Sequence, residues 1–179
     1  FLPEPWGGLN GYLDPRAING QQEFNLAFVH RYRMANDLIW DLINEPSFCN
    51  PQHLWECRPN YDAYETAAWN EWLKARYHYL SDKERTTHLQ EIYRTTPDEA
   101  LDLPKLEEFS DVSIFTNSRP LKVIDYRLFA QEMFSKWTKD MAALIRANGN
   151  RHQLVTVGQD EGGTGESPST QFFSETVDF

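Results

Sequence analysis

The sequence predicts an α/β protein built on parallel strands. Two short apolar segments, residues 38–43 and 153–157, have the length and composition of buried strands, and a segment with helical periodicity precedes each of them. The order helix, strand, long helical connection, strand is typical of parallel sheets, because consecutive parallel strands need a crossover connection. In such sheets ligands bind beyond the carboxyl ends of the strands, so polar residues at those ends are the first candidates for a functional site.

The first predicted helix begins at Asp14 and Pro15. Asp14 can accept hydrogen bonds from the free N–H groups of the first turn, and proline is well tolerated at the first helical position. The polar stretch 34–37 ends the helix. Between these limits, apolar residues recur at helical intervals: Ile18, Leu26, Val29 and Tyr32.

The first predicted strand, residues 38–43, has side chains that should alternate between two faces. The chain then reads Asn44-Glu45-Pro46, and the proline prevents the strand from continuing. From spacing alone, these three residues form a strand-terminating turn in which the glutamate is solvated.

Residues 48–120 are predicted to be a helical insertion. They hold a loop with prolines and both cysteines, followed by two helical segments, YDAYETAAWNEWLKARYHYL and DKERTTHLQEIYRT. Trp69 and Trp72 lie at helical spacing, which favours packing inside the protein over stacking on a sugar ring. One face of the first helix should carry Tyr64, Ala68, Trp72, Ala75 and Tyr79.

The last predicted helix runs from about Ile124 to Asn148, and Gly149 supplies its C-terminal stop. Its apolar face comprises Ala130, Met133, Phe134, Trp137, Met141, Leu144 and Ile145. The β-branched run HQLVTVG follows and leads into Gln159-Asp160-Glu161, so the second strand also ends on carboxylates.

Composition and charge exclude several classes of partner. The chain of 179 residues has 27 Asp and Glu against 17 Lys and Arg, a net charge of −10, and no basic run that could neutralise phosphates. We therefore expect no nucleic acid partner. We also expect no membrane partner, because no apolar run approaches the roughly 20 residues that span a bilayer.

No metal or cofactor is predicted. Cys49, His53 and Cys57 read C-x3-H-x3-C, but structural zinc sites use four ligands and the sequence offers no fourth. A disulfide between Cys49 and Cys57 is left open, because the redox compartment decides it. The glycine-rich GQDEGGTGES lacks the lysine of a phosphate-binding loop, and its acidic residues would repel phosphate.

The stretch IWDLINEP, residues 39–46, resembles the fourth-strand signature of clan A glycoside hydrolases, in which a hydrophobic strand ends in Asn-Glu. The RYR before the strand, the W-x-x-x-M-x-x-L-I-R of the last helix, and AWNEWLKARY, which is similar to segments of cellulase-like and β-galactosidase-like members, extend the resemblance. It implies that residues 1–179 are part of a (β/α)8 TIM barrel, about strands three to five, with the helical insertion 48–120 after strand four.

The resemblance also implies roles for residues at the two strand ends. Glu45 would be the general acid/base of a retaining glycoside hydrolase, and Asn44 would hydrogen-bond the sugar 2-hydroxyl. Such an enzyme uses one carboxylic acid to protonate the leaving oxygen and a second carboxylate, about 5 Å away, as nucleophile. In the family that nucleophile ends the seventh strand, so we expect it beyond Phe179.

The expected substrate is a β-linked oligosaccharide, polysaccharide or glycoside. Asp160 and Glu161, at the end of the second strand, and Trp6, in a Gly-Gly loop, are the further candidates for substrate contacts. The chain resembles a piece of a longer enzyme, so the isolated 179 residues should be inactive.

Two alternatives to an enzyme remain open. The chain could belong to a non-catalytic carbohydrate-binding relative that keeps the aromatic platforms. It could also be a structural fragment that associates with itself through open sheet edges, because unpaired edge strands readily pair with another chain.

Overall fold

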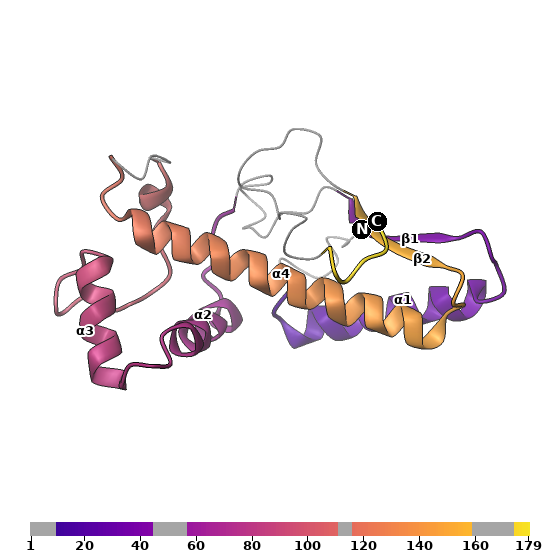
Figure 1. The fold of residues 1–179 in the computed structure, drawn as a ribbon, viewed down its shortest axis with the longest axis horizontal. Coiled ribbons are helices and arrows are strands. Elements are labelled where there is room, and N and C mark those ends of the chain that lie inside the picture. Colours follow the sequence, from indigo (N-terminus) through magenta and orange to yellow (C-terminus); the bar gives the residue numbers. More distant parts are fainter. Residues whose placement is uncertain (1–9, 45–56, 111–115, 159–173) are drawn as a thin grey trace. The chain divides into compact units, whose positions relative to one another are not determined.

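The structure is a computed structural model that describes residues 10–44, 57–110, 116–158 and 174–179. Helices dominate the described chain (Figure 1). In chain order the elements are α1 (Pro15–Tyr32), β1 (Ile39–Asn44), α2 (Ala63–Arg76), α3 (Asp82–Ile92), the 3-10 helix η2 (Leu106–Phe109), α4 (Pro120–Asn148) and β2 (Leu154–Gly158).

The chain divides into two compact units. The first unit comprises Phe1–Cys57 and Ala130–Phe179, and the second comprises Arg58–Phe129. The first unit is therefore discontinuous in sequence. The boundary between the units falls within α4, so each unit contains a part of that helix.

Helix α1 begins where the sequence predicts, because Asp14 caps it. The Asp14 carboxylate accepts a hydrogen bond of 2.9 Å from the backbone N–H of Arg16, and Pro15 occupies the first turn, where a missing N–H costs nothing. Ala17 and Val29 are fully buried on the inner face of the helix.

The two strands pair in parallel, as the alternation of helices and strands indicates. Ile39 lies opposite Leu154, and Asn44 lies opposite Gly158. The register shifts between Asp41 and Asn44, where β1 uses one more residue than β2. This extra residue is a β-bulge, a feature that bends a strand and often re-aims the side chains near its end.

Helices cover one face of the sheet. The core of the first unit consists of Val29 from α1, Ala142 and Ile145 from α4, and Val155 from β2, and Trp40, Leu42 and Leu144 pack against it. The alternation of strand side chains sends their neighbours to the other face. There Ile39 is 55% exposed and Leu154 is 42% exposed, so the described part of the chain leaves that face largely uncovered.

The second unit is built around aromatic side chains. The rings of Trp69 and Trp72 stack with centroids 5.5 Å apart, and Phe129 meets both of them edge-on. The prediction that these two tryptophans pack inside the protein is confirmed, since both are buried.

The predicted apolar face of α2 is only partly correct. Tyr64 is 40% exposed, and Tyr79 lies beyond the end of the helix and is 67% exposed. The buried face instead comprises Glu65, Trp69, Trp72 and Leu73. A glutamate takes an inward position that the hydrophobic pattern assigned to apolar residues.

The predicted fold class, part of a (β/α)8 TIM barrel with about strands three to five, is wrong. The described residues form one two-stranded sheet and are otherwise mostly helical or irregular. The local pattern of two helices and two apolar segments correctly indicates a parallel pair. Barrel closure requires further strands with a matching tilt and stagger, which a local pattern does not specify. The insertion at 48–120 stays a prediction, and its residues 48–56 lie outside the described residues.

Candidate functional site at the strand ends

The parallel register brings the carboxyl ends of β1 and β2 to the same edge of the sheet. Asn44, the last residue of β1, lies opposite Gly158, the last residue of β2. In open parallel sheets this edge is where ligands bind. Two of the sequence segments singled out for chemistry, Asn44-Glu45 and Gln159-Asp160-Glu161, thus leave the sheet from neighbouring positions.

Most of the predicted site residues are not among those that the structure describes. Glu45, Asp160, Glu161 and Trp6 lie outside the described residues, whereas Asn44 is in place at the end of β1. The roles of all five residues therefore stay predictions.

Asp41 makes a contact at this edge that the sequence reasoning did not identify. Its carboxylate oxygen Oδ1 accepts a hydrogen bond of 2.9 Å from the backbone N–H of Gly158. The signal in the sequence was a single carboxylate inside an otherwise apolar strand. It was overlooked because strand alternation accounts for a charged side chain on an exposed face without any partner.

The amino end of β2 is anchored by a buried amide. Gln153 accepts a hydrogen bond of 3.0 Å from the indole N–H of Trp40, and its own amide donates to the carbonyl oxygens of Tyr32 and Ala35, each at 2.8 Å. One side chain thus joins β1, β2 and the end of α1. Because its donor and acceptor groups are both satisfied, its burial carries little penalty.

The outer edge of β2 is held by the residues near the C-terminus of the described chain. The Val155 N–H donates to the Asp178 carboxylate at 2.7 Å, and the Asp178 N–H donates back to the Val155 carbonyl at 2.8 Å. Arg146 on α4 forms an ion pair of 3.1 Å with Asp178 and donates to the Thr176 carbonyl. These four contacts fix this segment against the strand and the helix.

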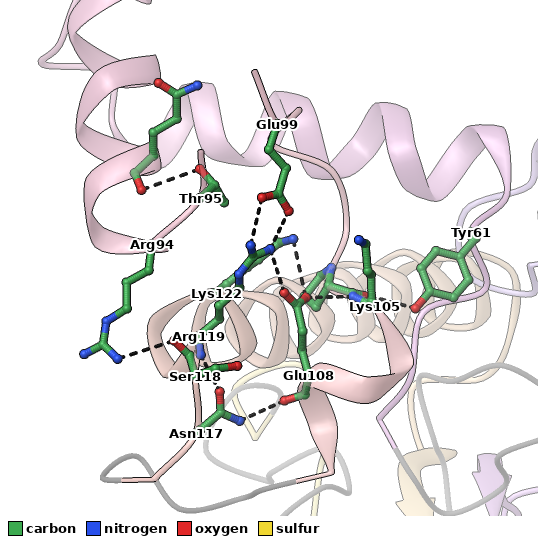
Figure 2. Close-up of polar contacts among 12 residues, drawn as sticks. Tyr61, Arg94, Thr95, Glu99, Lys105, Glu108, Asn117, Ser118, Arg119 and Lys122 are labelled. Carbon is green, nitrogen blue, oxygen red and sulfur yellow. Dashed lines mark hydrogen bonds and ion pairs between the residues drawn. The ribbon is translucent and has the colours of Figure 1, made fainter. Parts of the chain in front are cut away.

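A second concentration of charge lies in the other unit, and Figure 2 shows Arg119 between Glu99 and Glu108. Arg119 binds both oxygens of Glu99 and lies 3.0 Å from Glu108, and the Lys122 ammonium is 3.4 Å from the same Glu108 carboxylate. The guanidinium lowers the pKa of Glu99 to about 2, and burial lowers the pKa of Lys122.

The geometry of this cluster indicates a structural role. Glu108 accepts a further bond from the Lys105 N–H through its carboxylate, and its carbonyl accepts one from Asn117. The charges are thus engaged with one another and with the backbone. They join the loop at Glu99, the helix η2 and the residue that precedes α4.

Glu65 is the described carboxyl group whose pKa would best suit a general acid. Burial raises its pKa to about 7, although hydrogen bonds from Tyr126, Asn60 and Tyr61 oppose the rise. Both of its oxygens accept hydrogen bonds inside the second unit, and its side chain is fully buried. A carboxyl group without solvent access cannot protonate a substrate, so we assign Glu65 a structural role.

Within the described residues no three His, Cys, Asp or Glu side chains are arranged to hold a metal ion, and no helix is both long and apolar enough to span a bilayer. Cys57 is buried, whereas Cys49 and His53 lie outside the described residues, so the disulfide stays untested.

No family model matches the sequence, and no curated protein or solved structure matches the chain. The resemblance to glycoside hydrolases therefore rests on the residues of the sequence alone.

Proposed function

We propose that this chain carries the acid/base half of a retaining glycoside hydrolase that acts on β-linked glycans or glycosides. The observation that supports this most directly is the sheet register, in which Asn44 lies opposite Gly158. That register brings the ends of β1 and β2 to one edge of a parallel sheet. In the sequence, the predicted acid/base Glu45 follows the first end, and the predicted substrate contacts Asp160 and Glu161 follow the second. In open parallel sheets ligands bind beyond this edge.

In the proposed reaction, Glu45 gives its proton to the leaving glycosidic oxygen and later takes a proton from the attacking water. Asn44 hydrogen-bonds the sugar 2-hydroxyl, an interaction that strengthens in the oxocarbenium-like transition state. The second step needs a nucleophile, a carboxylate about 5 Å from the acid, and no described residue is assigned to it.

The test uses the protein that contains this chain in its natural sequence, with Glu45→Gln as the variant. The variant should lose about a hundred- to ten-thousand-fold in kcat/KM on alkyl glycosides and oligosaccharides, whose leaving groups need protonation. Dinitrophenyl glycosides should form the glycosyl-enzyme almost normally, because their leaving group departs as an anion. Added azide should then restore turnover and give a glycosyl azide, because azide needs no general base.

Glu71→Gln is the matched control, since Glu71 is exposed on α2 and pairs with Lys74 at the surface. It should leave both kinds of substrate unaffected. An equal loss of activity on activated and unactivated substrates in Glu45→Gln, without rescue by azide, would exclude Glu45 as the acid/base.

A further inference from the structure

Tyr61 has a backbone conformation that bulky residues rarely adopt. Its φ is 58°, and Arg94 is the other described non-glycine residue with a positive φ. In this region the side chain is crowded against the backbone, so the conformation persists only where surrounding contacts impose it. Residues held in this way concentrate at binding and catalytic sites, so Tyr61 is a candidate for such a role.

Both ends of Tyr61 are bound within the second unit. The buried carboxyl group of Glu65 accepts the Tyr61 N–H at 2.9 Å and the neighbouring N–H of Asn60 at 2.6 Å. The Tyr61 hydroxyl donates to the Pro104 carbonyl oxygen at 2.7 Å (Figure 2). Burial, with a smaller contribution from Glu107, raises the pKa of this hydroxyl to about 12, so it stays a donor at neutral pH. The ring is therefore held at its backbone and at its tip.

Tyr61 is nevertheless accessible. It is 44% exposed, whereas Trp69 and Phe129 in the core of the second unit are fully buried. The Glu107 carboxylate and the Arg58 guanidinium both act electrostatically on the Tyr61 hydroxyl. Glu107 is exposed and Arg58 is partly exposed. This surface thus offers a fixed aromatic ring with a hydrogen-bond acceptor and a donor near it.

A sugar ring matches this combination of groups. The C–H bonds on one face of a pyranose pack against the electron-rich face of an aromatic ring, and the hydroxyls around its rim hydrogen-bond to charged side chains. A tyrosine that is already fixed loses little conformational freedom on binding. Phosphate-bearing ligands fit less well, because Glu107 and the net charge of −10 repel them.

We propose that Tyr61 forms a platform on which one sugar ring of a glycan chain stacks, with Glu107 and Arg58 contacting the sugar hydroxyls. Tyr61 belongs to the second unit, whereas the strand ends belong to the first, so this is a binding site in addition to the predicted catalytic one. The choice of a β-linked glycan rests on the proposed glycoside hydrolase function. The platform itself does not depend on catalysis.

The test uses the protein that contains this chain with Glu45→Gln, so that the probes, cellohexaose and mannohexaose, are not consumed. At least one probe should slow hydrogen exchange of peptides that cover Arg58–Ala63. The sugar concentration that gives half-maximal protection should rise about three- to tenfold in Tyr61→Ala and Tyr61→Gly, the value of one aromatic contact. Glycine relieves the backbone strain, so a loss shared by both variants is not caused by misfolding.

Two variants and one further probe serve as controls. Tyr61→Phe keeps the ring and loses only the bond to Pro104, so its affinity should stay within about threefold of the wild type. Tyr79→Ala removes another tyrosine of the second unit, which is 67% exposed, and it should leave protection and affinity unchanged. Choline tests a different ligand, since an aromatic ring near a carboxylate also suits a cation.

Unchanged affinity in Tyr61→Gly, an equal loss in Tyr79→Ala, or protection by choline and by neither sugar would overturn the platform. If the wild type hydrolyses no β-linked glycoside but a sugar protects Arg58–Ala63 through Tyr61, the proposed function fails and the platform stands. An active wild type without this protection would overturn the platform and leave the proposed function in place.

Discussion

Glu65 shows how a single buried side chain can make stability depend on pH. Its oxygens accept three hydrogen bonds, from the N–H groups of Asn60 and Tyr61 and from the hydroxyl of Tyr126. These bonds do not fully replace the water that burial removes, so the pKa rises from 4.5 to about 7. Burial therefore favours the protonated form, whereas the three hydrogen bonds, which connect the loop before α2 to α4, favour the carboxylate.

The direction of the pH effect follows from proton binding. Between pH 4.5 and about 7 the folded state keeps the Glu65 proton while the unfolded state loses it, so stability falls as the pH rises through this range. The loss is complete above the folded pKa and should amount to about 3 kcal/mol. Urea unfolding of the chain at pH 5 and pH 8 measures it.

Glu65→Gln should reduce this fall, because glutamine resembles the protonated acid. Its carbonyl can accept from the two backbone N–H groups, and its amide can donate to the Tyr126 hydroxyl. Glu71→Gln on the same helix should keep the wild-type slope. Equal slopes in the wild type and Glu65→Gln would show that the Glu65 proton is not linked to folding.

At the scale of elements, the sequence predicts local structure well and long-range structure poorly. The start of α1 was predictable because Asp14 and Pro15 are local signals. The two strands were predictable from short apolar runs, but the bulge in β1 was not, because the bulge depends on the register with a strand more than a hundred residues away. The buried face of α2 was misjudged because Glu65 is satisfied by partners distant in sequence, and hydrophobicity does not report such partners.

The ion pairs of Arg119 connect three segments and should stabilise the second unit. Arg119→Lys removes the two-pronged contact with Glu99, since an ammonium cannot bind both oxygens as a guanidinium does. We expect a loss of about 1 to 3 kcal/mol in the free energy of unfolding, measured by urea titration. Lys136→Gln, which breaks the exposed pair with Asp140, should cost less than about 0.5 kcal/mol. Similar losses in both variants would mean that the Arg119 cluster contributes no more than a surface pair.

At the scale of the whole molecule, the sequence located the edge where a site could form. The parallel order of strands indicates that edge, and the register of Asn44 with Gly158 agrees with it. The barrel was predicted wrongly because a strand motif and its flanking helices describe only their own neighbourhood. The roles of Glu45, Asp160, Glu161 and Trp6 stay predictions, because these residues lie outside the described part of the chain.

The uncovered face of the sheet should cause the isolated chain to associate. Ile39 and Leu154 expose apolar surface, and β1 has an edge that no strand of the described chain pairs. Sedimentation velocity should show a species larger than a monomer that grows with concentration. The double variant Ile39→Lys with Leu154→Lys should shift it towards the monomer, whereas Phe28→Lys on the exposed side of α1 should not. A wild-type monomer at all concentrations, or dissociation by Phe28→Lys alone, would contradict this.

The discontinuity of the first unit has a consequence for biosynthesis. During translation Phe1–Cys57 is synthesised well before Ala130–Phe179, although these two stretches form one unit. The second unit, Arg58–Phe129, is continuous in sequence. All of its residues are therefore synthesised before β2, the strand that pairs with β1. During that interval the apolar side chains of β1 lack their eventual cover. The residues of β1 thus stay unpaired in the nascent protein until the residues between β1 and β2, and β2 itself, have been translated.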